Sequence, residues 1–235
     1  TQSRSSAASD VYKRQLLKQL GYNPKNHKLN LKPWIDLQKK IKKKKHKVKI
    51  AVVGKYTNLK DSYKSLNEAL IHGGIENSAD VDIQWINSEK ENNISLMKKL
   101  KGCRGILIPG GFGIRGINGK IIAIKYAREN NIPFFGICLG MQLAVIEIAQ
   151  NVLKIKNAHS SEFKKTTKSV VGLMTEWVNK NKIEKRDKNS DKGGTMRLGA
   201  YKAILKKNSK IFSIYKNRVI SERHRHRYEV NQKFL

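Results

Sequence analysis

The chain has 235 residues and a mass of 26.8 kDa, which suits one α/β domain with an appendage, or two small domains, and is too short for a large multidomain synthetase. Its 49 Lys and Arg residues against 18 Asp and Glu give a formal net charge of +31, which raises the question of a polyanionic partner. Lysine outnumbers arginine 38 to 11, whereas paired contacts with phosphates and bases favour arginine. We therefore expect most of the charge to lie on solvated lysine faces.

The positive charge is concentrated before residue 50. Residues 1–49 contain 15 Lys and Arg and only two acidic residues, and the densest block is the run 41–47. A block of like charges repels itself and stays solvated, which is typical of a linker. A basic nucleic-acid-binding module remains an alternative, although the run 39–49 lacks the interleaved aromatic residues on which bases would stack.

The cysteine and hydropathy patterns exclude several classes of protein. Cys103 and Cys138 are too few for a disulfide framework, and no Cys/His cluster has the spacing of a metal site. No segment approaches the ~18 apolar residues that span a bilayer, and the N-terminus lacks the apolar core of a signal peptide. We expect a soluble, cytoplasmic protein in a reducing compartment, with no metal and no membrane partner.

The first 47 residues differ from the rest in composition and in hydrophobic pattern. Residues 1–15 are rich in Ser and Ala and match no periodic element, so we expect them to be disordered or artefactual. Residues 16–47 have two short apolar patches separated by Gly21 and Pro24, which favours a basic interdomain linker or the tail of a missing domain. Residues 48–235 should form the folded domain.

From residue 48 onward, short apolar strands alternate with helical periodicity. The predicted strands are 48–54, 81–86, 105–108 and 132–137. The predicted helices begin near Leu66 (ending at Gly73–Gly74) and cover 90–101, 117–130 and 139–153. This alternation predicts a doubly wound, parallel α/β sheet.

Beyond residue 160 the pattern becomes rich in β-structure. The predicted strands are 169–174, 192–200, 201–205 and 228–230. The polar and highly charged segment 179–191 should be an exposed loop.

The loop 109–116 after the third strand is the first candidate for chemistry, because ligands of α/β sheets sit beyond the carboxyl ends of the strands. Gly111, Gly113 and Gly116 formally match the G-x-G-x-x-G fingerprint of dinucleotide-binding sites. The acidic residue expected ~20 positions later is absent, since the next strand ends at Cys138. A loop whose backbone N–H groups receive an oxyanion or an amide carbonyl fits better.

The second candidate is the turn Gly136-Ile137-Cys138-Leu139-Gly140, where the fourth strand gives way to a helix. It resembles a nucleophile elbow in which cysteine replaces serine, with flanking glycines that relieve the crowding of a sharp turn. The helix N-terminus should lower the thiol pKa, and the backbone N–H of Leu139 becomes a candidate oxyanion donor. The alternative is a buried structural cysteine, which is how we interpret Cys103.

These loops and their neighbours resemble the class I (triad-type) glutamine amidotransferases, and more narrowly the C-terminal glutaminase domains of the CTP synthase family. The match extends from about residue 16 to the end, and its segments are VGKY at 53–56, ALIHGG at 69–74, PGGFG at 109–113, GICLGMQ at 136–142, SSEF at 160–163, GGTMRLG at 193–199 and ERHRHRYEV at 222–230. The elbow indicates only the broad class, whereas the last two segments point to the narrower family.

The resemblance implies a flavodoxin-like, mostly parallel sheet with a β-rich C-terminal part. It implies a domain that releases ammonia from L-glutamine for a separate amidoligase domain, where UTP becomes CTP with ATP and Mg²⁺, and where GTP is an allosteric activator. It also implies a homotetramer at full length, no cofactor in this chain, and no nucleic-acid partner.

The same resemblance assigns roles to particular residues. Cys138 would be the catalytic nucleophile that forms a glutamyl thioester, and Gly111 with the Leu139 amide would hold the carbonyl oxygen. Leu139, Gly140, Met141 and Gln142 would line the glutamine pocket, and Glu162 and Arg227 would hold the amino-acid end. A zwitterionic substrate needs one anionic and one cationic partner, which these two residues would supply. The simpler alternatives are a surface position for Gln142 and Glu162 and a solvent-facing edge-strand position for Arg227.

A cysteine nucleophile needs a histidine base, and His224 and His226 are one candidate pair. The resemblance instead places the catalytic His-x-Glu beyond residue 235, so the domain would be truncated at its C-terminus, and gives His72 and His159 structural or GTP-interface roles. We therefore expect the isolated chain to make no CTP and to hydrolyse glutamine poorly. The remaining alternatives are another class I amidotransferase and a cysteine peptidase of the same fold.

Overall fold

The computed structural model describes most of the chain between residues 4 and 234. The described ranges are 4–22, 31–43, 46–57, 60–173, 176–179, 182–185 and 196–234. Lys44 and Lys45 of the basic run, and residues 193–195 of the GGTMRLG segment, lie outside the described residues.

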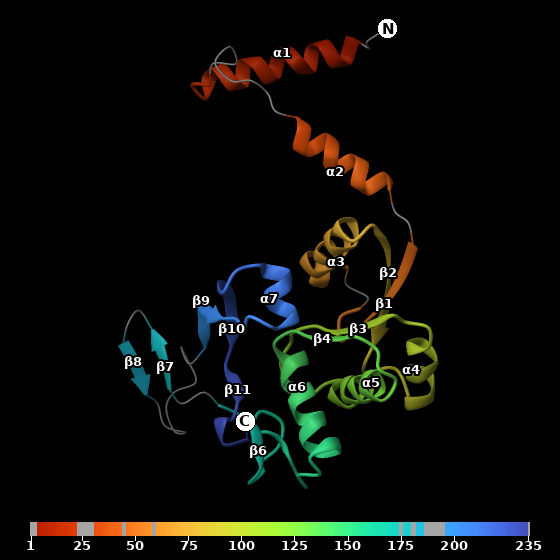
Figure 1. Ribbon diagram of the computed structural model, residues 1–235, viewed down its shortest axis with the longest axis vertical. Helices are drawn as coiled ribbons and strands as arrows, with labels where there is room; N and C mark the ends of the chain where they lie inside the picture. Colours follow the sequence, from red (N-terminus) through yellow and green to blue (C-terminus); the bar gives the residue numbers. More distant parts are fainter. Residues whose placement is uncertain are drawn as a thin grey trace.

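Four parallel strands form the central sheet, in the spatial order β2–β1–β3–β4 (Figure 1). They are β1 His46–Gly54, β2 Ala79–Asn87, β3 Gly105–Ile108 and β4 Phe134–Gly136. The second half of β1 and all of β3 are buried, which explains their continuous apolar sequences. The predicted parallel α/β sheet is confirmed.

Helices connect the strands: α3 Lys64–Glu76 follows the 3₁₀ turn η1 Lys60–Tyr63, and α4 Asn93–Leu100, α5 Ile117–Glu129 and α6 Leu139–Glu147 follow in order. In Figure 1, α4, α5 and α6 lie on one side of the sheet and α3 on the other. Leu96, Ile124 and Leu143 of the first group pack into one core with Val53 and Ile106. The final predicted turns of α6 form as the π-helix η2 Ile148–Val152.

The pair Gly73–Gly74 does not end α3, contrary to the sequence-based prediction. The helix continues to Glu76, and Gly74 is buried. A Cβ atom on Gly74 would lie 2.6 Å from Val81 Cγ2 and 2.8 Å from the Ala79 carbonyl oxygen. Glycine therefore lets the helix approach β2 closely here, and it does not act as a C-cap.

The C-terminal part is rich in β-structure. The three-stranded sheet has the order β11–β6–β5 and contains β5 His159–Ser160, β6 Ser169–Leu173 and β11 Tyr228–Val230. A hairpin joins β7 Glu176–Asn179 to β8 Lys182–Lys185, and an antiparallel pair joins β9 Arg197–Ile204 to β10 Val219–His226, with α7 Lys210–Tyr215 between them. The short 3₁₀ turn η3 Gln232–Phe234 follows β11.

Two predictions in this region are wrong in detail. Residues 192–200 and 201–205 were expected to be separate strands, but 197–204 is one strand because every residue in it pairs with β10. The loop expected over 179–191 contains β8, in which Ile183 is paired with Val178 of β7. Backbone pairing between β7 and β8 therefore forms a short hairpin that includes part of this charged segment.

Two helices precede the sheet, α1 Arg4–Gln19 and α2 Lys32–Lys42 (Figure 1). The disorder expected for 1–15 is thus corrected for residues 4–15, whose Ala, Lys, Arg and Gln residues favour helix. Side chains at 11–22 and 31–43 are exposed, and an ion pair of 2.7 Å joins Lys40 Nζ to Glu76 Oε2. Within the described ranges, no helix is both long and apolar enough to cross a membrane.

Candidate active site

The turn around Cys138 has the strained geometry of a nucleophile elbow. Cys138 has φ 51° and ψ −105°, in a region that residues with a side chain rarely adopt, and α6 begins at the next residue. A Cβ on Gly136 would lie 2.5 Å from the Gly140 carbonyl carbon, and a Cβ on Gly140 would lie 2.1 Å from the Ile108 carbonyl oxygen. Both glycines are therefore required by close backbone packing against each other and against β3.

The thiol of Cys138 is half-buried at this turn. It donates a hydrogen bond to the Arg225 carbonyl of β10, with an Sγ–O distance of 3.8 Å. Burial raises the thiol pKa above its ordinary value, the negative charge of Glu162 adds to this increase, and the Leu139 N–H opposes it. The predicted lowering of the pKa is thus wrong, because desolvation outweighs the single backbone donor of the helix N-terminus.

The glycine loop, residues 109–116, lies directly beside the elbow. A Cβ on Gly110 would be 3.5 Å from Cys138 Cβ, and a Cβ on Gly111 would be 3.5 Å from Leu139 Cδ2. The two segments that the sequence selected are therefore brought together, as is required if Gly111 and the Leu139 amide serve one oxyanion.

Glu162 reaches the same loop from the turn after β5. Its Oε1 accepts a hydrogen bond from the Gly113 N–H at 2.9 Å, and its own backbone N–H donates to Ser160 Oγ at 3.2 Å. Its charge also acts on Cys138 and on Tyr228. The half-buried carboxylate faces the candidate site, which disfavours the alternative of a free surface residue.

Residues 139–142 take different positions in the first turn of α6. Leu139 and Gly140 are buried, whereas Met141 is 42% exposed. Gln142 is only 4% exposed, and its Nε2 donates to the Tyr228 carbonyl at 2.8 Å. The alternative of a surface position for Gln142 is therefore wrong, since its amide ties α6 to β11.

Arg227 lies between β10 and β11 and is half-buried. Its Nε atom is buried and has no hydrogen-bond partner among the described residues. A buried guanidinium donor without an acceptor is energetically costly, so it favours an anionic ligand at this position.

The histidines of β10 form a contact with each other. His224 Nδ1 lies 2.9 Å from His226 Nε2, and His226 Nδ1 lies 3.2 Å from the Tyr228 carbonyl oxygen. Burial lowers the pKa of His226. In the part of the chain that the structure describes, neither histidine is hydrogen-bonded to Cys138, whose acceptor is the main chain of the intervening Arg225.

His72 and His159, the other two histidines considered from the sequence, lie elsewhere. His72 is on the exposed side of α3. His159 is in β5, where its ring packs edge-on against Phe163 with centroids 6.0 Å apart. The described residues contain no group of His, Cys, Asp and Glu side chains that could hold a metal ion.

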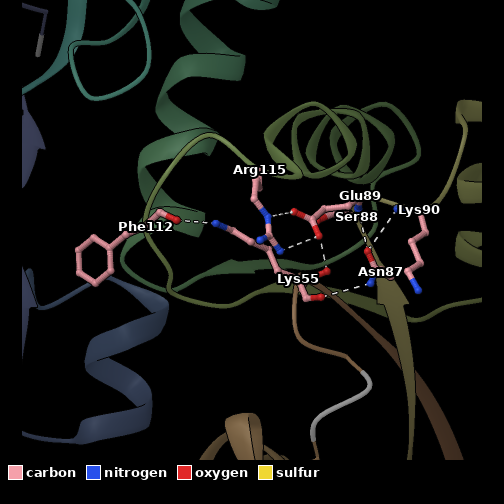
Figure 2. A network of polar contacts seen from close by, with 8 residues as sticks. Lys55, Asn87, Ser88, Glu89, Lys90, Phe112 and Arg115 are labelled. Atoms are coloured by element: carbon pink, nitrogen blue, oxygen red, sulfur yellow. Dashed lines mark hydrogen bonds and ion pairs between the residues drawn. The ribbon is translucent and has the colours of Figure 1, made fainter.

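A charged network around Lys55 was missed by sequence reasoning. Lys55 follows β1, is 7% exposed, and donates from Nζ to the Phe112 carbonyl of the glycine loop (Figure 2). Arg115, near the other end of that loop, forms two hydrogen bonds with Glu89, Nε to Oε1 at 2.6 Å and Nη2 to Oε2 at 3.1 Å. The available signal was the position of Lys55 at the carboxyl end of a buried strand.

Comparison with known proteins identifies the family of the chain. The family model described as "Glutamine amidotransferase class-I" matches residues 58–235. CTP synthase of Pelagibacter ubique is 58% identical over 207 residues, and CTP synthase of Agrobacterium fabrum is 56% identical over 207 residues. Each alignment covers 87% of this chain and 38% of the relative, so the chain spans well under half the length of these relatives.

A solved structure agrees with the sequence relatives. The glutaminase domain of Trypanosoma brucei CTPS, with bound acivicin, superimposes with a TM-score of 0.68 and 42% sequence identity, covering 80% of this chain and 69% of that one. Together with the family match, this likeness favours an amidotransferase over a peptidase of the same fold. The chain belongs to the class-I glutamine amidotransferase family, and within that family its similarity is to the glutaminase domains of CTP synthases.

Proposed function

We propose that the chain is the ammonia-supplying part of a CTP synthase and that Cys138 is its nucleophile. The observation that carries this proposal is the strained Cys138 turn, which lies against the glycine loop and presents the Leu139 N–H. A thiol at such a turn, with backbone donors beside it, suits attack on a carboxamide.

In the proposed reaction, Cys138 Sγ gives its proton to a general base and bonds to the side-chain carbonyl carbon of L-glutamine. The carbonyl oxygen becomes an oxyanion, which accepts hydrogen bonds from the backbone N–H groups of Leu139 and Gly111. The carbon–nitrogen bond then breaks, ammonia leaves with a proton from a general acid, and a glutamyl thioester remains. Water hydrolyses the thioester to glutamate and restores the thiol.

The amino-acid end of glutamine is assigned to Glu162 and Arg227. The buried, unpartnered Nε of Arg227 suits the α-carboxylate, and the half-buried carboxylate of Glu162 suits the α-ammonium. Leu139, Gly140, Met141 and Gln142 would line the pocket between them, with Gln142 contributing through its anchorage of α6 to β11.

Of the groups that the proposed reaction needs, a general base for Cys138 is the one that the described residues support least. Because neither His224 nor His226 is hydrogen-bonded to Cys138 in the described residues, and burial raises the thiol pKa, we propose slow glutamine hydrolysis by the chain alone. In the complete enzyme we propose that ammonia passes to an amidoligase domain that uses UTP, ATP and Mg²⁺, with GTP as activator, in a homotetramer.

The test is labelling with the analogue in which a chloromethyl ketone replaces the carboxamide of glutamine. The Cys138 sulfur would add to the ketone carbonyl carbon, which places negative charge on the ketone oxygen, and would then pass to the chloromethyl carbon as the carbonyl re-forms and chloride leaves. Intact-mass spectrometry detects the product as one adduct. We expect the adduct on the wild type and on Cys103→Ser, its loss in Cys138→Ser, and protection by L-glutamine. Labelling of Cys103, or labelling that glutamine does not slow, would refute the proposal.

A further inference from the structure

One peptide group of the glycine loop is held by opposite charges at its two ends. The carbonyl of Phe112 accepts a hydrogen bond from Lys55 Nζ, as Figure 2 shows. The N–H of the same peptide group, which belongs to Gly113, donates to Glu162 Oε1 at 2.9 Å. A cation therefore contacts the negative end of the peptide dipole and an anion contacts the positive end.

This arrangement fixes the orientation of a peptide that glycine would otherwise leave free. Gly113 has φ +77°, and a Cβ there would meet nothing within 4 Å, so packing does not hold this residue. Rotation of the peptide by half a turn would direct its carbonyl at the Glu162 carboxylate and its N–H at the Lys55 ammonium. Both contacts would become repulsive, so the two charges select one orientation.

Lys55 is itself held in position, so it can fix the orientation of the Phe112–Gly113 peptide. It follows β1 directly, and its own carbonyl accepts a hydrogen bond from Asn87 Nδ2 at 3.2 Å. The nearby carboxylate of Glu89 is occupied by both hydrogen bonds from Arg115. The Lys55 ammonium is therefore directed to the Phe112 carbonyl, in a position that is 7% exposed.

The orientation matters because Gly111 is the residue next to Phe112. A change in the direction of the Phe112–Gly113 peptide would move Phe112 and, through it, the Gly111 N–H beside the elbow. We propose that Lys55 is a positioning residue for the oxyanion site, acting with Glu162 as a charge clamp on the Phe112–Gly113 peptide. The inference rests on the proposed glutaminase function, and it also couples the glutamine-binding residue Glu162 to the oxyanion loop.

The experiment compares two thiol reagents on Lys55→Met, with Lys49→Met, an exposed lysine of β1, as the matched control. The glutamine chloromethyl ketone develops negative charge on an oxygen at the oxyanion site, whereas iodoacetamide only needs an accessible thiolate. For the ketone we measure the limiting alkylation rate and the half-saturating concentration separately. Circular dichroism and thermal unfolding confirm that each variant is folded.

We expect the limiting ketone rate of Lys55→Met to fall about tenfold or more, with the half-saturating concentration and the iodoacetamide rate unchanged within about twofold. Lys49→Met should match the wild type with both reagents. An equal fall with both reagents, or no fall with the ketone, would overturn the inference. If Lys55→Met does not fold, Lys55→Gln, which keeps a donor and loses the charge, undergoes the same two measurements and should show the same separation.

The two proposals fail in different ways. A wild-type chain that reacts with iodoacetamide at Cys138 but not with the ketone would refute the glutaminase function itself. A wild-type chain that reacts with both, together with a Lys55→Met variant that does the same, would leave the function intact and refute only the clamp.

Discussion

The two loops that meet at Cys138 are held in place by different forces. The elbow, residues 136–140, is fixed by contact between backbones, since a single Cβ on Gly140 would lie 2.1 Å from the Ile108 carbonyl oxygen. The glycine loop has room at residues 110–113, where added Cβ atoms would make ordinary contacts or none, and charged side chains hold it instead.

This difference separates two requirements of a nucleophilic site. The nucleophile must be held rigidly in a strained conformation, which close packing achieves at all pH values. The oxyanion donor must be oriented, which charges can do, and their effect depends on protonation state. The elbow should therefore be sensitive to added volume, and residues 110–113 of the glycine loop to changes of charge.

The largest expected effect is that of Gly140→Ala. The added methyl group cannot be accommodated without moving α6 away from β3, so we expect the free energy of unfolding to fall by about 3 kcal/mol. We also expect loss of ketone labelling at Cys138. Chemical denaturation and intact-mass spectrometry measure the two effects.

The matched variant is Gly111→Ala in the other loop. Its Cβ would lie at an ordinary 3.5 Å from Leu139 Cδ2, so the loss of stability should be less than about 1 kcal/mol. Equal destabilisation by the two substitutions would break the distinction between a packed loop and a charge-held loop.

A somewhat smaller effect is expected from Lys120→Met in α5, the helix that follows the glycine loop. Lys120 is 1% exposed in the first turns of α5, and burial, followed by the charge of Lys55, lowers its pKa from 10.5 to about 8. A positive charge near a helix N-terminus is also unfavourable. Removing the charge of Lys120 should raise the free energy of unfolding at pH 7 by about 2 kcal/mol. This is somewhat less than the free energy that corresponds to the whole pKa shift of Lys120, at about 1.4 kcal/mol per pKa unit.

The pH dependence distinguishes this charge effect from a packing effect. Below pH 8 both the folded and the unfolded chain carry the proton, so the full cost of the buried charge is present. Between about pH 8 and 10.5 the folded chain loses the proton first, so the wild type gains stability as the pH rises and the advantage of Lys120→Met shrinks. Denaturation at pH 7 and pH 9.5 measures this, and an advantage that is the same at both values would contradict the account.

The sequence predicted the elbow because the residues that form it are consecutive in the chain. A short apolar strand, a G-x-C-x-G turn and a largely apolar helix are adjacent, and each indicates the next. The direction of the Cys138 pKa shift was not predictable, since it depends on burial by β10 and on Glu162, which are distant in sequence.

Lys55 was missed for the opposite reason. Among 49 Lys and Arg residues, only its position after a buried strand marks Lys55, and the residue type itself does not distinguish a buried lysine from a solvated one. The general expectation of solvated lysine faces does not hold at Lys55 or Lys120. Gly74 was misread similarly, because a glycine that permits close packing and a glycine that ends a helix look the same in sequence.

The most direct test of the central claim is to trap the acyl intermediate itself. L-glutamate γ-methyl ester has a better leaving group than the glutamine amide, so the thioester should form even where a base is poorly placed. After an acid quench, intact-mass spectrometry with peptide mapping should find one glutamyl adduct on Cys138, retained in Cys103→Ser and absent from Cys138→Ser. An adduct on Cys103, or no adduct on a folded wild-type chain, would contradict the assignment of Cys138 as the nucleophile.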